Sequence, residues 1–274
     1  MSVNLSKADV LGFEASGVIL LKNVLTPEQV TVLKRGIDRG FQNPSPRHKV
    51  ASEESDTGKF FEDFRCWEEI PEYREIIFNS CLPKLASKLM QSKTVRLHHD
   101  HMLIKAPKTQ ARTPWHQDTP YYNLEGNQTI SFWIPVDPVP VESGLEFIAG
   151  SHKWPWMMPR TFKDNAAKWF PEGSLPELPD IEGNRMQFPI VAFDMQPGDV
   201  VAFNFHMMHA GQGSTGMRRA MSIRYIGDDV VHIKRPWVTS PYFPELEKEG
   251  ELASGSPFNH RLFPVVYVDK AIKL

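Results

Sequence analysis

Hydrophobic side chains recur at helical spacing in the first third of the chain and at strand spacing afterwards. One helix start is marked by Thr26, which suits an N-cap, by Pro27 at the first helical position, and by Gln29, which closes a capping box. Four apolar residues then share one helical face: Val30, Leu33, Ile37 and Phe41. The pattern therefore predicts an amphipathic helix from Pro27 onwards.

Two further helical regions lie on either side of this helix. Residues 6–15 form a short helical pattern, followed by Gly17 and an apolar strand over 18–21. Residues 71–92 carry a pair of helical patterns, within which Pro83 either breaks the run or starts the second helix. Residues 43–59 are polar and rich in Pro, Ser, Glu and Lys, so they predict a mobile loop.

The hydrophobic period changes after Ser92. Residues 95–105 alternate as a long strand with mixed side chains on both faces. Four more strand candidates are separated by turns rich in Gly, Pro and Asp, and they are 129–134, 145–149, 199–205 and 218–226. Helices first and many short strands later predict a mainly β fold, a β-sandwich or jelly roll with flanking helices packed on one sheet.

One long segment interrupts the strands. Residues 153–190 contain Trp154, Trp156, Trp169 and several prolines, and they are too many for a hairpin connection. Such insertions are usually lids or binding loops. The tail after residue 231 is rich in proline and aromatic residues and has little periodicity. Because we find no internal repeat and no linker, we expect a single domain over residues 1–274 with a lid insertion at 153–190.

Composition and charge exclude several classes of function. The formal net charge of −2 gives no basic field that would attract nucleic acid or anionic lipid. The N-terminus is polar, and the longest early apolar run is far too short to span a bilayer. The two cysteines fit a reducing compartment. We therefore expect a cytoplasmic protein without nucleic-acid or membrane partners and with its oligomeric state left open.

The first candidate chemical site is the stretch TPWHQDTPYY at residues 113–122. His116 and Asp118 lie two residues apart, and on an extended segment such side chains point to the same side. An imidazole nitrogen and a carboxylate oxygen can then meet at one point. With a second histidine they would form a two-histidine, one-carboxylate site, which suits non-haem Fe(II). Because His-x-Asp triplets are common, the prediction depends on finding the third ligand.

His209 is the preferred third ligand. It follows the apolar strand candidate 199–205, and small residues come directly after it, which lets a ligand approach the backbone. Arg218 opens the next strand and shares a face with the small residues Ala220 and Ser222. That face predicts a cavity with a cation at its end, suited to a small dicarboxylate held by a bidentate arginine.

Together these residues resemble the phytanoyl-CoA dioxygenase family of Fe(II)/2-oxoglutarate-dependent oxygenases. The resemblance runs from the strand after Gly17 to Arg218, which is most of the chain. It is carried by several short motifs in a fixed order: Thr113–Asp118, Glu142–Glu146, Gly150-Ser151-His152, Pro197-Gly198-Asp199, and His209 followed by Arg218. The fold that the resemblance implies is a double-stranded β-helix, the cupin-like form of the jelly roll.

The resemblance implies a metal role for three residues. His116, Asp118 and His209 would bind Fe(II), and Arg218 would pair with the distal carboxylate of 2-oxoglutarate. Arg219 is the fallback for that pairing, although its parity places it with apolar neighbours.

Three further residues match positions near the cosubstrate, 2-oxoglutarate. By similarity Lys105 and Trp133 line its pocket. The chain departs from the family pattern at Gly211, where some members have serine. A contact from that hydroxyl would be missing here or supplied by another group such as Gln212 or Ser214.

The implied reaction uses O2 and 2-oxoglutarate to hydroxylate an unactivated C–H of a small molecule, with release of succinate and CO2. Related halogenases have a small residue at the position of Asp118, so the carboxylate favours hydroxylation, or a desaturation or cyclisation variant. The lack of a basic groove favours a free small molecule over an acyl-CoA thioester. Candidate substrate contacts are His101, Tyr121, Tyr122, Gln117 and Trp154.

Three alternative interpretations stay open. His99 and His101 alternate like the His-x-His pair of a cupin-type metalloenzyme, although no glutamate follows at fitting spacing. His206 is a rival to His209, with the opposite strand parity and without small flanking residues. The chain could also be a metal-binding jelly roll without oxygenase activity. His152 is expected to have a structural role in its turn.

Overall fold

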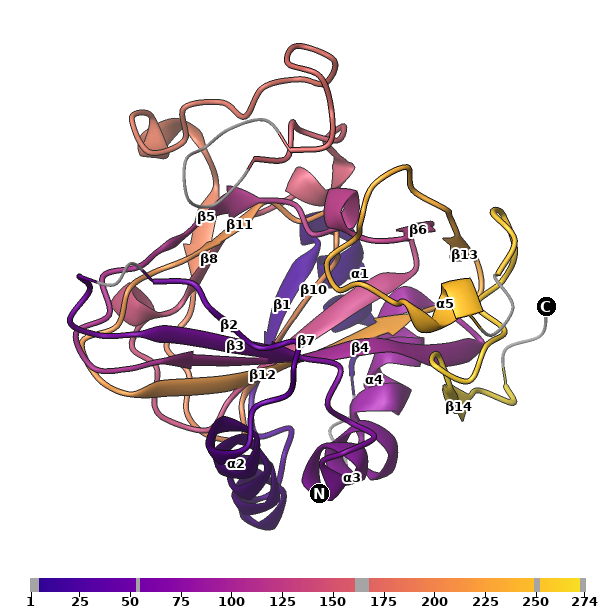
Figure 1. Ribbon diagram of the computed structural model, residues 1–274, viewed down its shortest axis with the longest axis horizontal. Helices are drawn as coiled ribbons and strands as arrows, with labels where there is room; N and C mark the ends of the chain where they lie inside the picture. The colour runs from indigo at the N-terminus through magenta and orange to yellow at the C-terminus, as the bar shows by residue number, and fades with distance from the viewer. Residues whose placement is uncertain (1–4, 53–54, 161–167, 249–251, 272–274) are drawn as a thin grey trace.

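A computed structural model describes residues 5–52, 55–160, 168–248 and 252–271 (Figure 1). The helices are α1 (Lys7–Ser16), α2 (Pro27–Gln42), α3 (Pro71–Asn79), α4 (Leu82–Met90) and α5 (Glu245–Lys248). The strands are β1 (Val18–Leu21), β2 (Lys49–Val50), β3 (Phe60–Phe64), β4 (Thr94–Lys105), β5 (Thr113–His116), β6 (Leu124–Glu125), β7 (Thr129–Pro135), β8 (Leu145–Ile148), β9 (Ile190–Ala192), β10 (Val200–Phe203), β11 (His209–Gly211), β12 (Arg218–Ile226), β13 (Val231–His232) and β14 (Val265–Val268).

Two antiparallel sheets form the body of the molecule. The large sheet has the strand order β1-β10-β7-β12-β4-β3-β2, with β14 added on β4. The small sheet has the order β5-β11-β8-β9. Figure 1 shows β5, β8 and β11 on one side of the large sheet and α2, α3 and α4 on the other side. The prediction of a mainly β jelly roll with helices on one sheet is confirmed, and the arrangement is the double-stranded β-helix.

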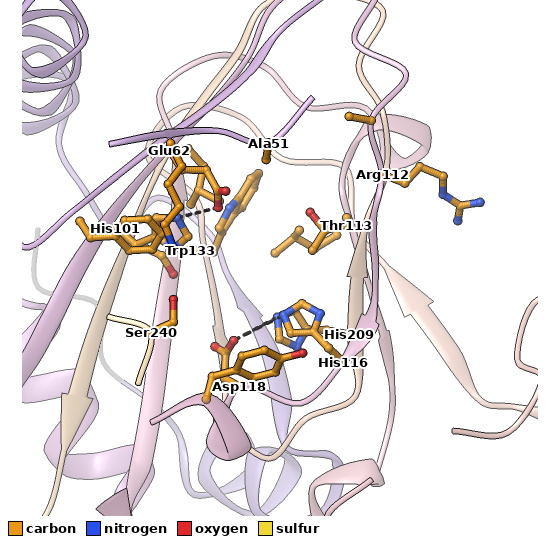
Figure 2. A pocket seen from close by; sticks show the side chains of 18 of the residues that line it. Ala51, Glu62, His101, Arg112, Thr113, His116, Asp118, Trp133, His209 and Ser240 are labelled. Atoms are coloured by element: carbon orange, nitrogen blue, oxygen red, sulfur yellow. Dashed lines mark hydrogen bonds and ion pairs between the residues drawn. The ribbon is translucent and has the colours of Figure 1, made fainter. Parts of the chain in front are cut away.

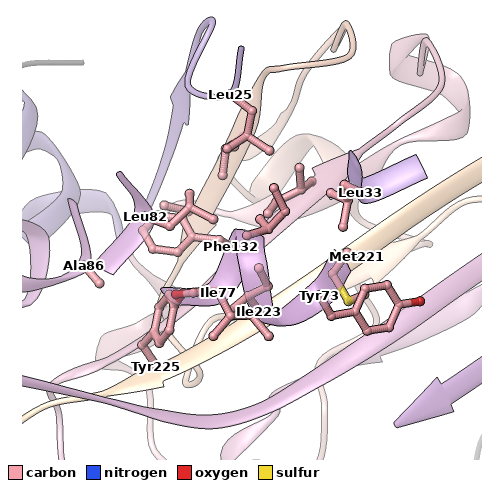
Figure 3. Close-up of a cluster of buried hydrophobic side chains, with 14 of the residues drawn as sticks. Leu25, Leu33, Tyr73, Ile77, Leu82, Ala86, Phe132, Met221, Ile223 and Tyr225 are labelled. Carbon is pink, nitrogen blue, oxygen red and sulfur yellow. The ribbon is translucent and has the colours of Figure 1, made fainter. Parts of the chain in front are cut away.

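A hydrophobic core joins the helices to the outer face of the large sheet (Figure 3). Met221 and Ile223 of β12 point into it and meet apolar side chains of α2, α3 and α4, among them Leu33, Ile77 and Leu82. Each such side chain contributes about 1.5–3 kcal/mol when fully buried. Because strand residues alternate between faces, this core turns the even-numbered residues of β12 towards the interior. Within the described ranges, no helix is long and apolar enough to cross a membrane.

Helix α2 begins as predicted. The Thr26 hydroxyl accepts a hydrogen bond from the Gln29 backbone, and the Gln29 side chain accepts one from the Thr26 backbone. The prediction that Phe41 belongs to the buried face is wrong, since its side chain is 50% exposed. Gly36 and Gly40 lie at the buried face because α3 packs very closely there. A Cβ at Gly36 would come within 2.8 Å of the Glu72 Cβ atom.

Five of the strands agree with the predicted ranges. β4, β7, β8, β10 and β12 begin and end within two residues of the bounds expected from alternation. The loop predicted over 43–59 instead contains β2, which pairs with β3, although residues 53–54 lie outside the described ranges. β9 and β14 were also not predicted. β2 and β9 have two and three residues, which are too few to show a period, and their partner strands define them.

Part of the segment 153–190 packs on the small sheet. Trp154 and Met157 contact a buried cluster that includes Trp115, Ile148 and Met208. Residues 161–167 of this segment lie outside the described ranges. The described part thus covers the outer side of the strands that carry the candidate metal ligands.

Candidate metal centre

A cavity of about 830 Å³ opens between the two sheets. Figure 2 shows Glu62, His101 and Trp133 on one wall, from the large sheet, and His116, His209 and Thr113 on the other. A concave site of this size with convergent polar groups is the expected place for a ligand.

Strand pairing brings together three metal-ligating side chains. β5 and β11 pair so that His116 and His209 lie opposite one another, with ring centroids 4.2 Å apart. Asp118 follows β5 by two residues. Its Oδ1 atom lies 3.5 Å from the Nε2 atom of His116 and 4.0 Å from that of His209. All three ligand atoms lie within 4.8 Å of one another, and no other group of this kind occurs among the described residues.

The second ring nitrogen of each histidine is held by the backbone. The Nδ1 atom of His116 lies 2.8 Å from the Pro114 carbonyl, and that of His209 lies 2.9 Å from the Met207 carbonyl. Because Nδ1 of each ring faces a backbone carbonyl, Nε2 is the nitrogen directed at Asp118 and would be the metal ligand. Burial and the nearby His116 lower the pKa of His209 to about 3, which keeps the ring neutral at pH 7. Two imidazoles and one carboxylate fit an Fe(II) site with open positions.

Arg224 fixes the orientation of the carboxylate. Its Nε and Nη2 atoms donate to the Asp118 Oδ2 atom at 3.3 and 3.2 Å, which leaves Oδ1 directed at the histidines. Burial opposes ionisation of Asp118, but the Arg224 charge, a hydrogen bond with His116 and the nearby His209 outweigh it. They hold the pKa of Asp118 well below its usual range. The Asp118 carboxylate is therefore ionised, and contacts within the protein orient all three ligand side chains.

The register of the strands sets the order of the side chains along the large-sheet wall of the cavity. At one end of β12, Arg218 lies opposite Lys105 of β4. Further along, Ser222 lies opposite Trp133 of β7, and Arg224 lies beyond it on the same face. Arg218, Ser222, Trp133 and Arg224 line the cavity, whereas Lys105 is fully buried beside Arg218 and is not part of the lining. Arg218, predicted from alternation to face inward, therefore does so.

Arg219 points out of the cavity. Its guanidinium bonds Asp137, with Nη2 2.6 Å from Oδ1, and Asp38, with Nη1 2.7 Å from Oδ1. The fallback assignment of Arg219 to 2-oxoglutarate is thus contradicted by its position, because alternation places it on the opposite face from Arg218.

Two basic side chains, Arg218 and Lys105, are buried next to each other at one end of the cavity, and Arg218 is the one that lines it. Arg218 donates to the Ser143 carbonyl at 2.5 Å, and Lys105 donates to the Ala111 and Gln212 carbonyls, both at 2.7 Å. Among the described residues, neither cation has a carboxylate oxygen within 4.0 Å. A buried cation without an acid is costly, so this end is suited to an anionic ligand.

We expect the Lys105 amine to take up a proton when an anion binds near it. Burial and the Arg218 charge lower the pKa of Lys105 to about 6, so its amine is mostly neutral above that pH in the free protein. A carboxylate beside it favours the ammonium form and raises this pKa. Between pH 7 and 8 we therefore expect binding of 2-oxoglutarate to take up close to one proton, measured by calorimetry in buffers of different ionisation enthalpy.

The matched control for this measurement is Lys105→Met. The variant should bind more weakly and show no proton uptake in the same pH range. An equal uptake by the variant and the wild type would contradict the assignment to Lys105.

The neighbouring strand β5 places a hydroxyl group beside Gly211. Gly211 lies opposite Thr113, and a Cβ at Gly211 would be 3.2 Å from the Thr113 Oγ1 atom. Thr113 lines the cavity (Figure 2). By contrast, the Gln212 side chain bonds Glu146 and the Ser214 hydroxyl bonds the Gly216 carbonyl. A hydroxyl is therefore present beside Gly211, from Thr113 and from neither of the two residues considered in the sequence.

The residues suggested for substrate contact divide into two groups. His101, Tyr121 and Tyr122 line the cavity. Gln117 does not, because alternation turns it away from Asp118, and its amide bonds backbone groups of residues 155, 157 and 206. Trp154 packs in the cluster outside the small sheet and likewise does not line the cavity.

The remaining histidines have other partners. His206 lies 3.1 Å from the Thr119 hydroxyl and accepts from the Trp156 indole at 2.9 Å. His152 lies 3.2 Å from the Glu14 carbonyl, as a structural role requires. His99 and His101 both line the cavity but belong to no metal-ligating group of the described residues, which disfavours a cupin-type pair.

Two site residues were missed from sequence. Arg224 shares the parity of Arg218 six residues later, so its inward direction was available from alternation. Glu62 accepts a hydrogen bond from His101 at 2.9 Å, and its strand β3 was not predicted. Nothing in the local pattern marks Glu62.

Comparison with known families decides the relationship. The model of the phytanoyl-CoA dioxygenase family matches residues 13–220. The chain belongs to this family. A comparison with curated proteins finds no match. Membership places this phytanoyl-CoA dioxygenase family protein among the oxygenases that use iron and 2-oxoglutarate, and the His-Asp-His triad has the donor set for that iron.

Solved structures similar to this family member support the same fold. The non-heme alpha ketoglutarate dependent carbocyclase SnoK from nogalamycin biosynthesis is 24% identical, covers 96% of each chain and has a TM-score of 0.75. The epimerase SnoN in complex with Fe3+, alpha ketoglutarate and nogalamycin RO is 18% identical over 94% of this chain and 96% of its own, with a TM-score of 0.72. EctD from S. alaskensis, with 2-oxoglutarate and 5-hydroxyectoine, is 18% identical over 81% and 76%, with a TM-score of 0.63.

Proposed function

We propose that this protein is an Fe(II)- and 2-oxoglutarate-dependent dioxygenase that hydroxylates an unactivated C–H of a small molecule. One observation carries the proposal. The triad of His116, Asp118 and His209 shares a single cavity with Arg218, a buried cation that has no acid partner among the described residues. A metal site and a carboxylate site in one cavity match the two ends of 2-oxoglutarate.

Each residue of the triad region has a distinct task in this proposal. His116, His209 and the Asp118 Oδ1 atom would hold the iron, and Arg224 keeps that carboxylate oriented. When bound with 2-oxoglutarate and O2, the iron supplies the oxidising power for C–H cleavage. The protein's contribution is to hold the target C–H near the metal and to exclude water.

The cosubstrate would lie between the triad and the cationic end. Arg218 binds its distal carboxylate, and Lys105 adds a second donor. Trp133 lies below the Arg218 guanidinium, with 5.7 Å between the guanidinium carbon and the ring centroid. Thr113 offers its hydroxyl from the opposite wall, beside Gly211. These four side chains hold the molecule by charge and by shape.

Hydroxylation is the proposed outcome of the reaction. The Asp118 carboxylate would fill one coordination position of the iron, and this disfavours halogenation. The relatives named as a carbocyclase and an epimerase make cyclisation and epimerisation the competing outcomes. Mass analysis of the product distinguishes them, since hydroxylation adds one oxygen atom, cyclisation removes two hydrogens, and epimerisation leaves the mass unchanged.

A cosubstrate omission experiment tests the proposed activity. With Fe(II), 2-oxoglutarate and O2, we expect the wild-type protein to release succinate slowly without substrate and faster with it. Omitting any one of the three should stop the release, which is measured by chromatography of succinate together with oxygen uptake. Succinate release that continues without iron would contradict the proposal.

A further inference from the structure

Two lysines line the solvent end of the cavity. Lys49 comes from β2, and its Nζ atom lies 5.3 Å from the centroid of the Phe64 ring. Lys168 is half-buried, and its Nζ atom lies 4.4 Å from the Trp169 ring and 5.1 Å from the Tyr121 ring. Each ammonium group therefore lies near the face of at least one aromatic ring, which attracts a cation.

Neither ammonium group forms an ion pair with a described residue, although the charge of Lys49 helps to lower the pKa of Glu62. Among the described residues, no carboxylate oxygen lies within 4.0 Å of either Nζ atom. Both lysines line the same cavity, and burial, followed by the charge of Lys49, lowers the pKa of Lys168. Arg112, a third cation on the cavity wall, is instead paired with Glu182 at 3.1 Å. The lysines thus differ from the other surface cation of this cavity.

The cavity wall near Lys49 also carries acidic groups. Glu62 lies opposite Lys49 in the register of β2 and β3, but its Oε1 atom accepts from His101. Burial opposes its ionisation, and His101, Lys49 and Lys105 outweigh burial, so the pKa of Glu62 stays below its ordinary value. Asp56 also lines the cavity. An acidic group of a substrate would be repelled from Glu62 and attracted to the space between the lysines.

We propose that Lys49 and Lys168 bind the acidic group of the substrate, which is a small molecule with a carboxylate or phosphate at the end facing solvent. Its carbon body then lies against Phe64 and Tyr121, and the C–H to be oxidised points inward to the triad. This inference rests on the proposed function for the inner end of the molecule, and on the two lysines alone for the outer end.

Three test ligands with one carbon skeleton examine the charge preference: 4-phenylbutyrate, 4-phenylbutanol and 4-phenylbutylamine. Dissociation constants are measured by ligand-observed NMR on the full chain loaded with Zn(II) and 2-oxoglutarate. We expect the carboxylate to bind about tenfold more tightly than the alcohol and the amine to bind most weakly, with the preference declining at high salt. A phosphate of the same skeleton separates the two acidic groups.

Charge-removing and charge-keeping variants assign the effect to the lysines. Lys49→Gln and Lys168→Gln should each weaken 4-phenylbutyrate about threefold, and together about tenfold, without changing the alcohol. Lys49→Arg with Lys168→Arg should keep the preference. Lys84→Ala, on the exposed side of α4, is the control and should bind like the wild type. An unchanged preference in the double Gln variant would overturn the proposal.

Two rival outcomes are distinguishable from this one. If the lysines instead attract 2-oxoglutarate, the double Gln variant would weaken 2-oxoglutarate and leave the order of the three ligands unchanged, which overturns the proposal. A chain that binds the carboxylate through these lysines but never releases succinate would contradict the proposed reaction and leave the anion site standing. A chain that releases succinate but binds the alcohol as tightly would overturn the anion site alone.

Discussion

Replacing His116 or Asp118 by alanine is expected to lower 2-oxoglutarate-dependent succinate release by at least about 100-fold. Replacing a group that only orients a metal ligand already lowers metal affinity or activity by about 10–100-fold, and loss of the ligand itself should cost more. The measurement is succinate release without substrate, paired with the Fe(II) dissociation constant of each variant. His48→Gln, an exposed histidine outside the cavity, is the control and should behave like the wild type.

The two variants should differ in stability even though both lose activity. Asp118→Ala leaves the buried Arg224 without its acid, and breaking such a pair costs about 3–5 kcal/mol. His116→Ala removes no charge partner and should unfold at a concentration of denaturant closer to that of the wild type. Succinate release that is unchanged in folded His116→Ala would show that the triad does not hold the catalytic metal.

Replacing Arg218 by methionine is expected to raise the dissociation constant of 2-oxoglutarate roughly 100-fold, or about 3 kcal/mol. The guanidinium is buried and bonds only carbonyl oxygens in the free protein, so its charge is available to the ligand. Removing an uncompensated buried cation should leave the ligand-free protein as stable as the wild type or more so. Calorimetric titration and thermal unfolding give the two quantities.

Arg219→Met is a matched control for this prediction. The neighbouring arginine pairs with Asp137 and Asp38 outside the cavity. Its loss should cost about 1 kcal/mol of stability and change 2-oxoglutarate binding by less than about threefold. An equal effect of both variants on 2-oxoglutarate would contradict the separation of the two faces of β12.

The metal triad could be predicted because strand geometry leaves few choices. His116 and Asp118 are two residues apart, and alternation alone puts them on one side. The same alternation distinguished Arg218 from Arg219 without coordinates. It also argued against Gln117, whose position between the two ligands turns its amide to the backbone around residue 206. The suggestion that Gln117 contacts substrate ignored the rule that located its neighbours.

Features that depend on distant partners could not be predicted. Phe41 and Gly40 are adjacent in sequence, and only the close approach of Tyr73 decides that the glycine is buried. Glu62 reaches the cavity because β3 pairs with β4, and five residues carry no recognisable period of their own. The Thr113 hydroxyl beside Gly211 likewise depends on the register of two strands.

Strand β12 fixes the distance between the two ends of the cavity. Arg218 and Arg224 are six residues apart, about 20 Å along an extended strand, and both face the interior because six is even. Inserting or deleting one residue between them would turn one arginine into the helix-covered core. Length changes in this strand are therefore confined to pairs of residues, whereas the described residues of the segment 153–190 that pack outside the small sheet have no such parity. Substrate range in this architecture can thus diverge through surface segments while the spacing between metal and cosubstrate stays constant.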